Sequence, residues 1–219
     1  MNLGPLYACS QVLVNSLPIP SRVFDFGANE GGVAEHFAGL GSVVHAYEPV
    51  PVMYDRLVRV AGRQSSVIPH RLAVSNLPGQ LRNVNVFNAW TLLPNDTERD
   101  KAVEFKESPG FDCDVTTLDL EVVKYGDPDF IKIDVDGFEF RVLQGGLNFL
   151  TRKRPPIQFE YSYLPTFLGD SVEEMARLIY GLGYQAWSMD GSYRSPTADD
   201  FLDNFPEGSS YDVMLLSGG

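Results

Sequence analysis

Four acidic residues stand at or near the ends of apolar segments in this sequence: Asp25, Glu48, Asp134 and Glu160. Short apolar runs such as the one that contains Asp25 are typical of strands buried on both faces of a parallel sheet. Parallel strands end at a common edge of the sheet, where open α/β sheets bind their ligands. We therefore expect these carboxylates to gather at one site, where they accept hydrogen bonds or take up protons.

A glycine-rich turn, Gly27-Ala-Asn-Glu-Gly-Gly32, follows the first apolar run and precedes a helix that begins near Val33. Its glycines permit positive φ and let a ligand approach the backbone, and the first helical turn offers unpaired N–H groups. Glu48 follows Asp25 by 23 residues, close to the spacing at which a strand-end acid binds ribose hydroxyls. The glycines could serve turn geometry alone, and Glu48 could be a solvated acid at a strand end. The combined pattern favours a nucleoside ligand instead.

Asp134, Asp136 and Glu139 form a second acidic cluster in IDVDGFE. Asp136 and Glu139 have the spacing of a capping box, and we favour helix capping for this pair, with Asp136 as the N-cap. Asp134 ends a buried strand and is a candidate for ligand contact or general base catalysis, with Asp136 as a second candidate base. Asp134 and Glu160 also suit a hard cation, but two acids from separate strand ends do not identify a metal site, and no metal is predicted.

The sequence has three histidines, and they differ in their surroundings. His36 lies in the first expected helix and His45 inside the second expected strand, so we interpret both as packed structural residues. His70 precedes a segment, 71–75, whose end is expected to reach the site. His70 is therefore a third candidate base, provided that its ring faces the pocket.

The composition excludes several classes of protein. With 219 residues and no break in composition, the chain is expected to form one domain. There are 17 basic against 29 acidic residues, a net charge of −12, and nucleic acid is not an expected partner. Cys9 and Cys113 are the two cysteines, which fits buried thiols in a reducing compartment and leaves one disulfide open as an alternative. Without a long apolar segment, a cytoplasmic protein without membrane contact is expected.

The remaining pattern alternates strands and helices, which predicts a mostly parallel sheet covered by helices on both faces. Pro69 predicts an edge position, a bulge or a break within the third strand, 66–75. Residues 2–16 have helical spacing and are expected to form a short cap over the site. The segment 76–115 begins as a hairpin and continues through Trp90, Thr91 and a polar stretch, which is either an acceptor-contacting insertion or a solvated loop. The strands expected are 22–26, 43–48, 66–75, 129–134, 156–160, 184–189 and 211–216, and the main helices begin near 33, 49, 137 and 171.

Three blocks resemble the FkbM family of S-adenosylmethionine-dependent methyltransferases, within the wider class I methyltransferase fold. They are VFDFGANEGG with YEP behind it, HRLAVSN, and IKIDVDGFEFRVLQGG with the later QFEYS. Many class I enzymes share the first block, whereas the third is more specific to this family. The blocks fall between residues 23 and 162, so they cover most of the expected sheet.

The resemblance implies an α/β fold, a Rossmann-like three-layer sandwich with a seven-stranded, mostly parallel sheet whose last strand is antiparallel. It also implies a single domain over 1–219, with an N-terminal cap at 1–20 and a substrate-side insertion at about 76–117. In this family pattern, residues 25–31 hold the methionine part of S-adenosylmethionine, Glu48 binds the ribose, Ala73 lies near the adenine, and Asp134 lies close to the sulfonium methyl group. The implied cofactor-binding residues are Asp25, Phe26, Gly27, Ala28, Asn29, Gly31, Glu48, Pro49, Ala73, Asp134 and Val135.

Members of the family typically methylate oxygen on natural products or sugars, so the resemblance implies a small, hydroxylated acceptor. Two other functions remain open. A nicotinamide-dependent oxidoreductase would also use Glu48, although Asn29 replaces the expected second glycine and no second nucleotide-binding half is visible. The other is a cofactor-binding partner protein without catalysis.

Overall fold

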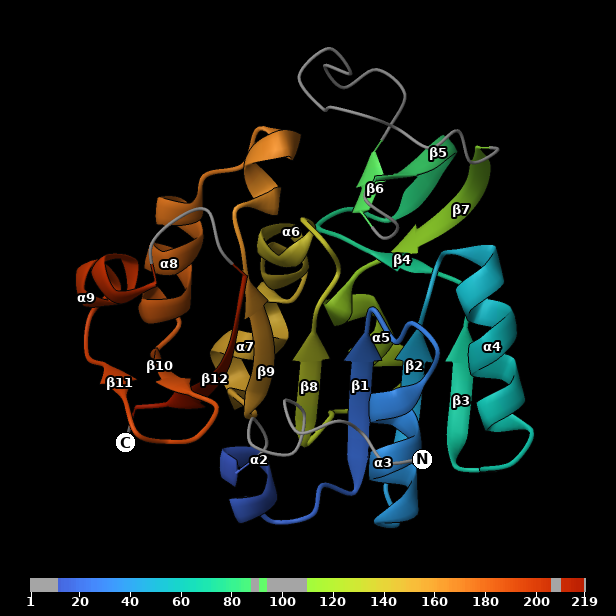
Figure 1. The fold of residues 1–219 in the computed structure, drawn as a ribbon, viewed down its shortest axis with the longest axis horizontal. Coiled ribbons are helices and arrows are strands. Elements are labelled where there is room, and N and C mark those ends of the chain that lie inside the picture. Colours follow the sequence, from blue (N-terminus) through green and yellow to red (C-terminus); the bar gives the residue numbers. More distant parts are fainter. Residues whose placement is uncertain (1–11, 88–90, 94–109, 206–209, 219) are drawn as a thin grey trace.

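The computed structural model describes residues 12–87, 91–93, 110–205 and 210–218. Most of the chain forms one large twisted sheet with helices on both faces, and a smaller sheet stands beyond the carboxyl ends of its parallel strands (Figure 1). The strands of the large sheet are β1 (Arg22–Phe26), β2 (Val43–Tyr47), β3 (Val67–His70), β8 (Phe130–Ile133), β9 (Ile157–Tyr161), β10 (Tyr184–Ser188), β11 (Arg194–Ser195) and β12 (Tyr211–Ser217). The smaller sheet contains β4 (Ala73–Val74), β5 (Gly79–Phe87), β6 (Thr91–Leu93) and β7 (Phe111–Thr116).

The strand order of the large sheet is β11-β10-β12-β9-β8-β1-β2-β3. β3, β2, β1, β8 and β9 are parallel, and β12 inserts antiparallel between β9 and β10. The antiparallel last strand is therefore confirmed. The expected count of seven is short by β11, a two-residue strand that forms because the chain turns back at Gly191 (φ +74°) and pairs with β10.

Helices cover both faces of the large sheet and complete a three-layer sandwich (Figure 1). They are α2 (Val12–Ser16), α3 (Gly32–Gly39), α4 (Pro51–Ala61), α5 (Leu118–Tyr125), α6 (Glu139–Gln144), α7 (Leu147–Lys153), α8 (Val172–Gly181) and α9 (Ala198–Asn204), with a 3-10 helix η2 (Leu164–Leu168). β1 illustrates why both faces are covered. Val23 packs with the core beneath α3 and α4, whereas Phe24 and Phe26 pack with the core beneath α5 to α8, as the period-two alternation of a strand requires.

Pro69 was expected to cause an edge position, a bulge or a break in the third strand, and the structure shows an edge position and a break. The expected third strand is broken in two, with β3 at the edge of the large sheet and β4 paired with β7 in the smaller one. Proline lacks an N–H donor, so an edge strand tolerates it where a central strand does not. Because β4 leaves the large sheet just beyond β3, the chain carries Ala73 and Val74 toward the carboxyl ends of the neighbouring strands (Figure 1).

The segment after β4 forms the smaller sheet, in the order β4-β7-β5-β6. The expected hairpin is present as the antiparallel pair of β5 and β6. Trp90 and the stretch 94–109 lie outside the described residues, as do Cys9 and the first part of the expected N-terminal helix. The described part of that helix, α2, lies near the amino ends of the strands, so this part does not form the expected cap over their carboxyl ends (Figure 1). In the described ranges, the helices are too short or too polar to cross a lipid bilayer.

Candidate active site

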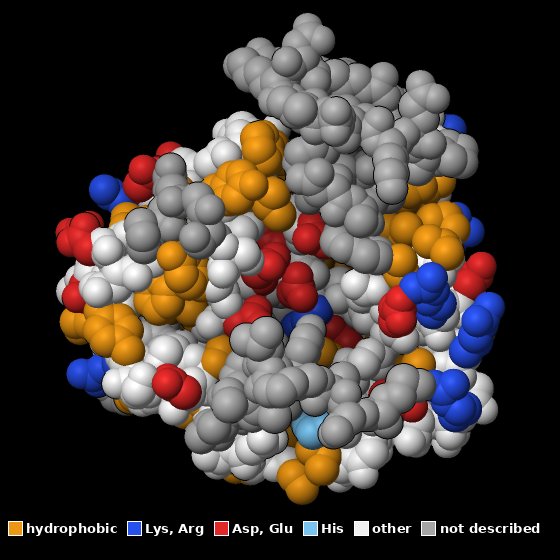
Figure 2. Space-filling model, in the orientation of Figure 1, with side chains coloured by type: hydrophobic (Ala, Val, Ile, Leu, Met, Phe, Trp, Pro, Cys, Tyr) orange, Lys and Arg blue, Asp and Glu red, His pale blue; other side chains and the backbone are white. Residues whose placement is uncertain are grey.

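One cavity opens at the carboxyl ends of β1, β2 and β8, where the smaller sheet approaches the large one. Figure 2 shows acidic side chains gathered around a hollow at the centre of this face. The cavity is lined by Gly27, Asn29, Tyr47, Glu48, Pro49, Val50, Leu72, Ala73, Val74, Asp134, Val135, Asp136 and Phe138. It therefore joins residues from all three sequence blocks at the edge of the sheet that the strand-end acids predicted.

The glycine-rich turn is hydrogen-bonded to the end of β2. The backbone N–H groups of Gly27 and Ala28 both donate to the carbonyl oxygen of Tyr47, at 3.0 and 2.9 Å. Gly27 has a φ of +78°, and a Cβ at this position would collide with the carbonyl oxygen of Asp134. Only glycine fits here, and its small size brings the turn against the end of β8.

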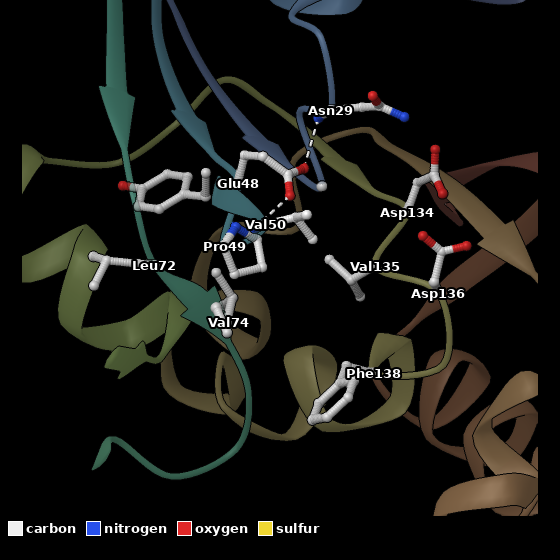
Figure 3. A pocket seen from close by; sticks show the side chains of 13 residues that line it. Asn29, Glu48, Pro49, Val50, Leu72, Val74, Asp134, Val135, Asp136 and Phe138 are labelled. Atoms are coloured by element: carbon white, nitrogen blue, oxygen red, sulfur yellow. Dashed lines mark hydrogen bonds between the residues drawn. The ribbon is translucent and has the colours of Figure 1, made fainter. Parts of the chain in front are cut away.

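Glu48 is buried just beyond β2, and both of its carboxylate oxygens face backbone donors (Figure 3). Oε2 accepts the N–H of Asn29 and Oε1 accepts the N–H of Val50, each at 2.8 Å. Burial raises the pKa of Glu48 to about 7, although these two hydrogen bonds oppose the increase. A carboxylate has about four acceptor positions, so two remain for hydroxyl groups of a ligand in the cavity.

A cluster of three carboxylates lies beside the cavity and comes from the ends of two neighbouring strands. One carboxylate oxygen from each of Asp134, Asp136 and Glu160 can be chosen so that the three atoms lie within 4.8 Å of one another. Burial, reinforced by the charge of Asp134, raises the pKa of Asp136 to about 6 and that of Glu160 to about 8. This spacing would also suit a hard cation, the alternative considered for Asp134 and Glu160, but the cluster alone does not assign a metal site.

Lys132 is a buried cation beneath this cluster, and it connects the two loops of the site. Its Nζ donates to the carbonyl oxygen of Gly27 at 2.7 Å and lies 3.0 Å from Asp134 Oδ2 and 3.6 Å from Asp25 Oδ1. Burial favours the neutral amine, but the charges of Asp134 and Asp25 outweigh it and raise the pKa of Lys132. The lysine thus stays charged and balances two carboxylates. A lone lysine inside the apolar run FIKI was the sequence signal for this role.

The expected capping box at Asp136 and Glu139 is wrong. The N-cap of α6 is Phe138, and α6 has no side-chain cap. Gly137, with a φ of +112°, delays the start of the helix, so Asp136 stays in the preceding loop. Asp136 itself has a left-handed φ of +50° and lies next to Asp134 (Figure 3). The residue expected to cap a helix is instead a second carboxylate at the cavity.

The structure brings most of the predicted residues to the cavity and places the others around it. Asp25 lies fully buried below the glycine-rich turn, where burial raises its pKa and Lys132 opposes the increase. Phe26 belongs to the apolar core, and Ala28 is buried behind the turn. Gly31 packs against Leu57 of α4. These four residues support the cavity without lining it.

His70 is not brought to the cavity. Its Nε2 lies 3.1 Å from Nδ1 of His45, and its ring stacks on Tyr47 and packs near Tyr125. Burial lowers the pKa of His45 to about 4 and also lowers that of His70. The condition set for His70 as a base, a ring that faces the pocket, is not met, whereas the structural interpretation of His45 agrees with this packing.

The sequence interpretation missed the apolar wall of the cavity. Leu72 and Val74 flank Ala73, and Phe138 follows the acidic loop (Figure 3). Apolar side chains on one side and convergent polar groups on the other are typical of sites for small molecules. Their position next to Ala73 and inside IDVDGF was the available signal, but single apolar residues are too common to identify a wall.

Comparisons with known proteins identify a family and a fold for the chain. The model of a family described as "Methyltransferase FkbM domain" matches residues 25–186, which is more than half of the chain. Among curated proteins, no sequence matches the chain.

Solved structures share the fold at low sequence identity. The FkbM methyltransferase from Methylobacillus flagellatus KT is 19% identical with a TM-score of 0.57, and the match covers 94% of this chain and 47% of that one. This chain thus spans about half the length of that protein. A TehB-like SAM-dependent methyltransferase from Corynebacterium glutamicum is 11% identical, with a TM-score of 0.51 and coverage of 99% and 90%. Fibrillarin from Aeropyrum pernix, solved with natively bound S-adenosyl-L-methionine, is 12% identical, with a TM-score of 0.50 and coverage of 96% and 73%.

Proposed function

The chain belongs to the FkbM methyltransferase family, which implies methyl transfer from S-adenosylmethionine, and we propose that it methylates a hydroxyl oxygen of a small molecule such as a natural product or a sugar. The observation that carries the proposal is the placement of Asp134 and Asp136 on the same cavity as Glu48. One part of the cavity thus offers acceptors for ribose hydroxyls, and another offers carboxylates that can take a proton.

The residues of the cavity fit the cofactor. The turn at Gly27 has no side chain to obstruct the methionine end, and Glu48 has acceptor positions left for the two ribose hydroxyls. The apolar side chains of Leu72 and Val74 suit one face of the adenine. When bound, S-adenosylmethionine supplies a methyl group that is activated by its sulfonium charge.

Asp134 and Asp136 are proposed to act on the acceptor. A hydroxyl group is a poor nucleophile at neutral pH unless a base accepts its proton. Asp136, whose pKa is raised to about 6, is largely ionised at neutral pH and is a stronger base than an ordinary aspartate. Lys132 holds the Asp134 carboxylate at 3.0 Å and thereby fixes the position of the neighbouring acid. Positioning of the two reactants supplies the rest of the acceleration.

Two measurements test this function separately. Calorimetry with S-adenosylhomocysteine and with NAD tests the cofactor, and binding of NAD alone would favour the oxidoreductase. Incubation of the protein with S-adenosylmethionine and a panel of hydroxylated metabolites, with mass spectrometry of the products, tests the acceptor.

Variants then connect the acids to turnover. Asp134→Ala and Asp136→Ala are compared with Asp203→Asn, which alters an exposed carboxylate on α9. Loss of methyl transfer in the first two, with cofactor binding retained in Asp136→Ala, supports the proposed base. Turnover at the wild-type rate in both would remove these acids from the mechanism. Cofactor binding without methyl transfer to any hydroxylated compound would favour a cofactor-binding partner protein.

A further inference from the structure

Glu139 is a fully buried carboxyl group that the proposed mechanism does not use. It begins α6, none of its surface is exposed, and it does not line the cavity. Burial raises its pKa to about 8, with backbone hydrogen bonds opposing the increase. A buried acid is costly unless its oxygens are hydrogen-bonded, so its partners indicate what it does.

The partners of Glu139 are backbone groups of the loop that carries the cavity acids. Oε1 accepts the N–H of Val135 at 2.9 Å, and Oε2 accepts the N–H of Gly137 at 2.9 Å. Oε1 also lies 3.1 Å from the same Gly137 nitrogen. The two donors stand on either side of Asp136, so one side chain holds the loop before and after the acid.

The held loop has an unusual shape that needs such support. Asp136 and Gly137 are consecutive left-handed residues, with φ of +50° and +112°. The left-handed conformation is unfavourable for a residue with a Cβ, and it persists where the surroundings impose it. This turn is what brings Asp136 beside Asp134 at the cavity (Figure 3). At its start the loop is also fixed by the N–H of Asp134, which donates to Phe26 at 3.2 Å.

We propose that Glu139 is a positioning residue for methyl transfer. It acts through the backbone amides of Val135 and Gly137, and it keeps Asp136 at the acceptor end and Val135 against the cofactor cavity. The catalytic part of this inference rests on the proposed function. The structural part, that the carboxyl group of Glu139 shapes the loop, is measurable on the protein alone.

Glu139→Gln is the informative change because it keeps the size of the side chain. The amide has one carbonyl oxygen in place of two, and its NH₂ group cannot accept a backbone N–H. One of the two loop amides therefore loses its acceptor. Tyr184→Phe is the matched control, since it removes a buried hydrogen bond to a backbone carbonyl, that of Pro155 at 3.0 Å, away from the cavity.

The experiment combines hydrogen exchange with calorimetry. Exchange by mass spectrometry follows the peptide that contains 134–138, and calorimetry measures the Kd for S-adenosylhomocysteine. For Glu139→Gln we expect exchange in that peptide to rise about tenfold, and the Kd to rise about tenfold, as one lost hydrogen bond predicts. With an accepted substrate, the turnover number falls as well. Tyr184→Phe leaves the loop exchange, the Kd and the turnover number unchanged, even if its melting temperature falls as far.

The outcomes separate the inference from the proposed function. Unchanged loop exchange in Glu139→Gln overturns the inference, and so does faster exchange with an unchanged Kd and turnover number, which would make Glu139 only structural. If the wild-type protein does not bind S-adenosylhomocysteine, the proposed function fails, whereas the exchange comparison still decides whether Glu139 holds the loop. Should Glu139→Gln not fold, Gly137→Ala strains the same loop with Glu139 intact, and the same changes in exchange and Kd are expected.

Discussion

Replacing Glu48 by glutamine is expected to weaken cofactor binding about tenfold to a hundredfold. The carboxylate has two acceptor positions occupied by the N–H groups of Asn29 and Val50, at 2.8 Å each, and two left for ribose hydroxyls. The amide has one oxygen fewer, so one ribose hydroxyl loses its acceptor, and so does one of the two backbone N–H groups. A hydrogen bond to a charged acceptor contributes about 1.5–3 kcal/mol, which corresponds to this range of Kd.

The same carboxyl group predicts how affinity depends on pH. Its pKa in the free protein is raised to about 7, chiefly by burial, and hydroxyl donors favour the ionised form. Affinity is therefore full above about pH 7 and falls as the pH decreases through 7, by up to about tenfold per pH unit. Glu48→Gln has no proton to gain at this position, so its Kd loses the part of the pH dependence that Glu48 causes.

Calorimetry with S-adenosylhomocysteine, at several pH values between about 6 and 8, measures both effects. Glu35→Gln is the control, because it neutralises an exposed glutamate of α3 that pairs with Arg63 at 3.3 Å. That variant should bind as the wild type does. A wild-type Kd in Glu48→Gln above pH 7, or a wild-type protein whose Kd does not change with pH, would refute this account of Glu48.

Three further changes test other parts of the site. Asp136→Asn should lower the turnover number by about 10²–10⁴ with little change in the Kd for S-adenosylhomocysteine, since a base contributes to the chemical step; a normal turnover number would exclude it as the base. Gly27→Ala should lower the melting temperature and abolish cofactor binding, because the new Cβ meets the carbonyl of Asp134 and φ is +78°; thermal denaturation with and without S-adenosylhomocysteine shows both, and unaltered binding would contradict the described contact. Lys132→Met should destabilise the protein by about 3–5 kcal/mol in urea denaturation, because the buried Asp25 loses its counter-charge. Adding Asp25→Asn should restore part of that loss, and equal stability of the single and double variants would show that the pair is not coupled.

The sequence predicted those parts of the structure that depend on only a few neighbouring residues. Short apolar runs located the strands of the large sheet, Pro69 located the break between β3 and β4, and the position of Glu48 after β2 placed it at the cavity. Each of these follows from backbone geometry within a few residues. Family resemblance supplied the antiparallel position of β12, which apolar patterning alone does not reveal.

Other residues were predicted wrongly or missed because their local sequence is compatible with more than one structure. Asp136 and Glu139 have capping-box spacing, but the left-handed Gly137 delays the helix, and Glu139 reaches back to the loop instead. His70 ends β3, and the side of a strand that a residue faces changes with a shift of one position. The wall at Val74 required the pairing of β4 with β7 across a long stretch of chain, and local patterns do not encode such pairing.

The contact between Gly27 and the end of β8 has a consequence for protein engineering. The glycine-rich turn lies against the carbonyl oxygen of Asp134, and Lys132 contacts both this turn and the loop that begins at Asp134. These two segments therefore cannot be redesigned one at a time. A library that varies residues 25–31 or 132–139 alone would mostly yield unfolded chains. Strand β5 of the smaller sheet, which lies between β7 and β6, has no such hydrogen bond to the glycine-rich turn among the described contacts. Residues of β5 can therefore be varied without changing the two central loops, whereas those two loops are best varied together.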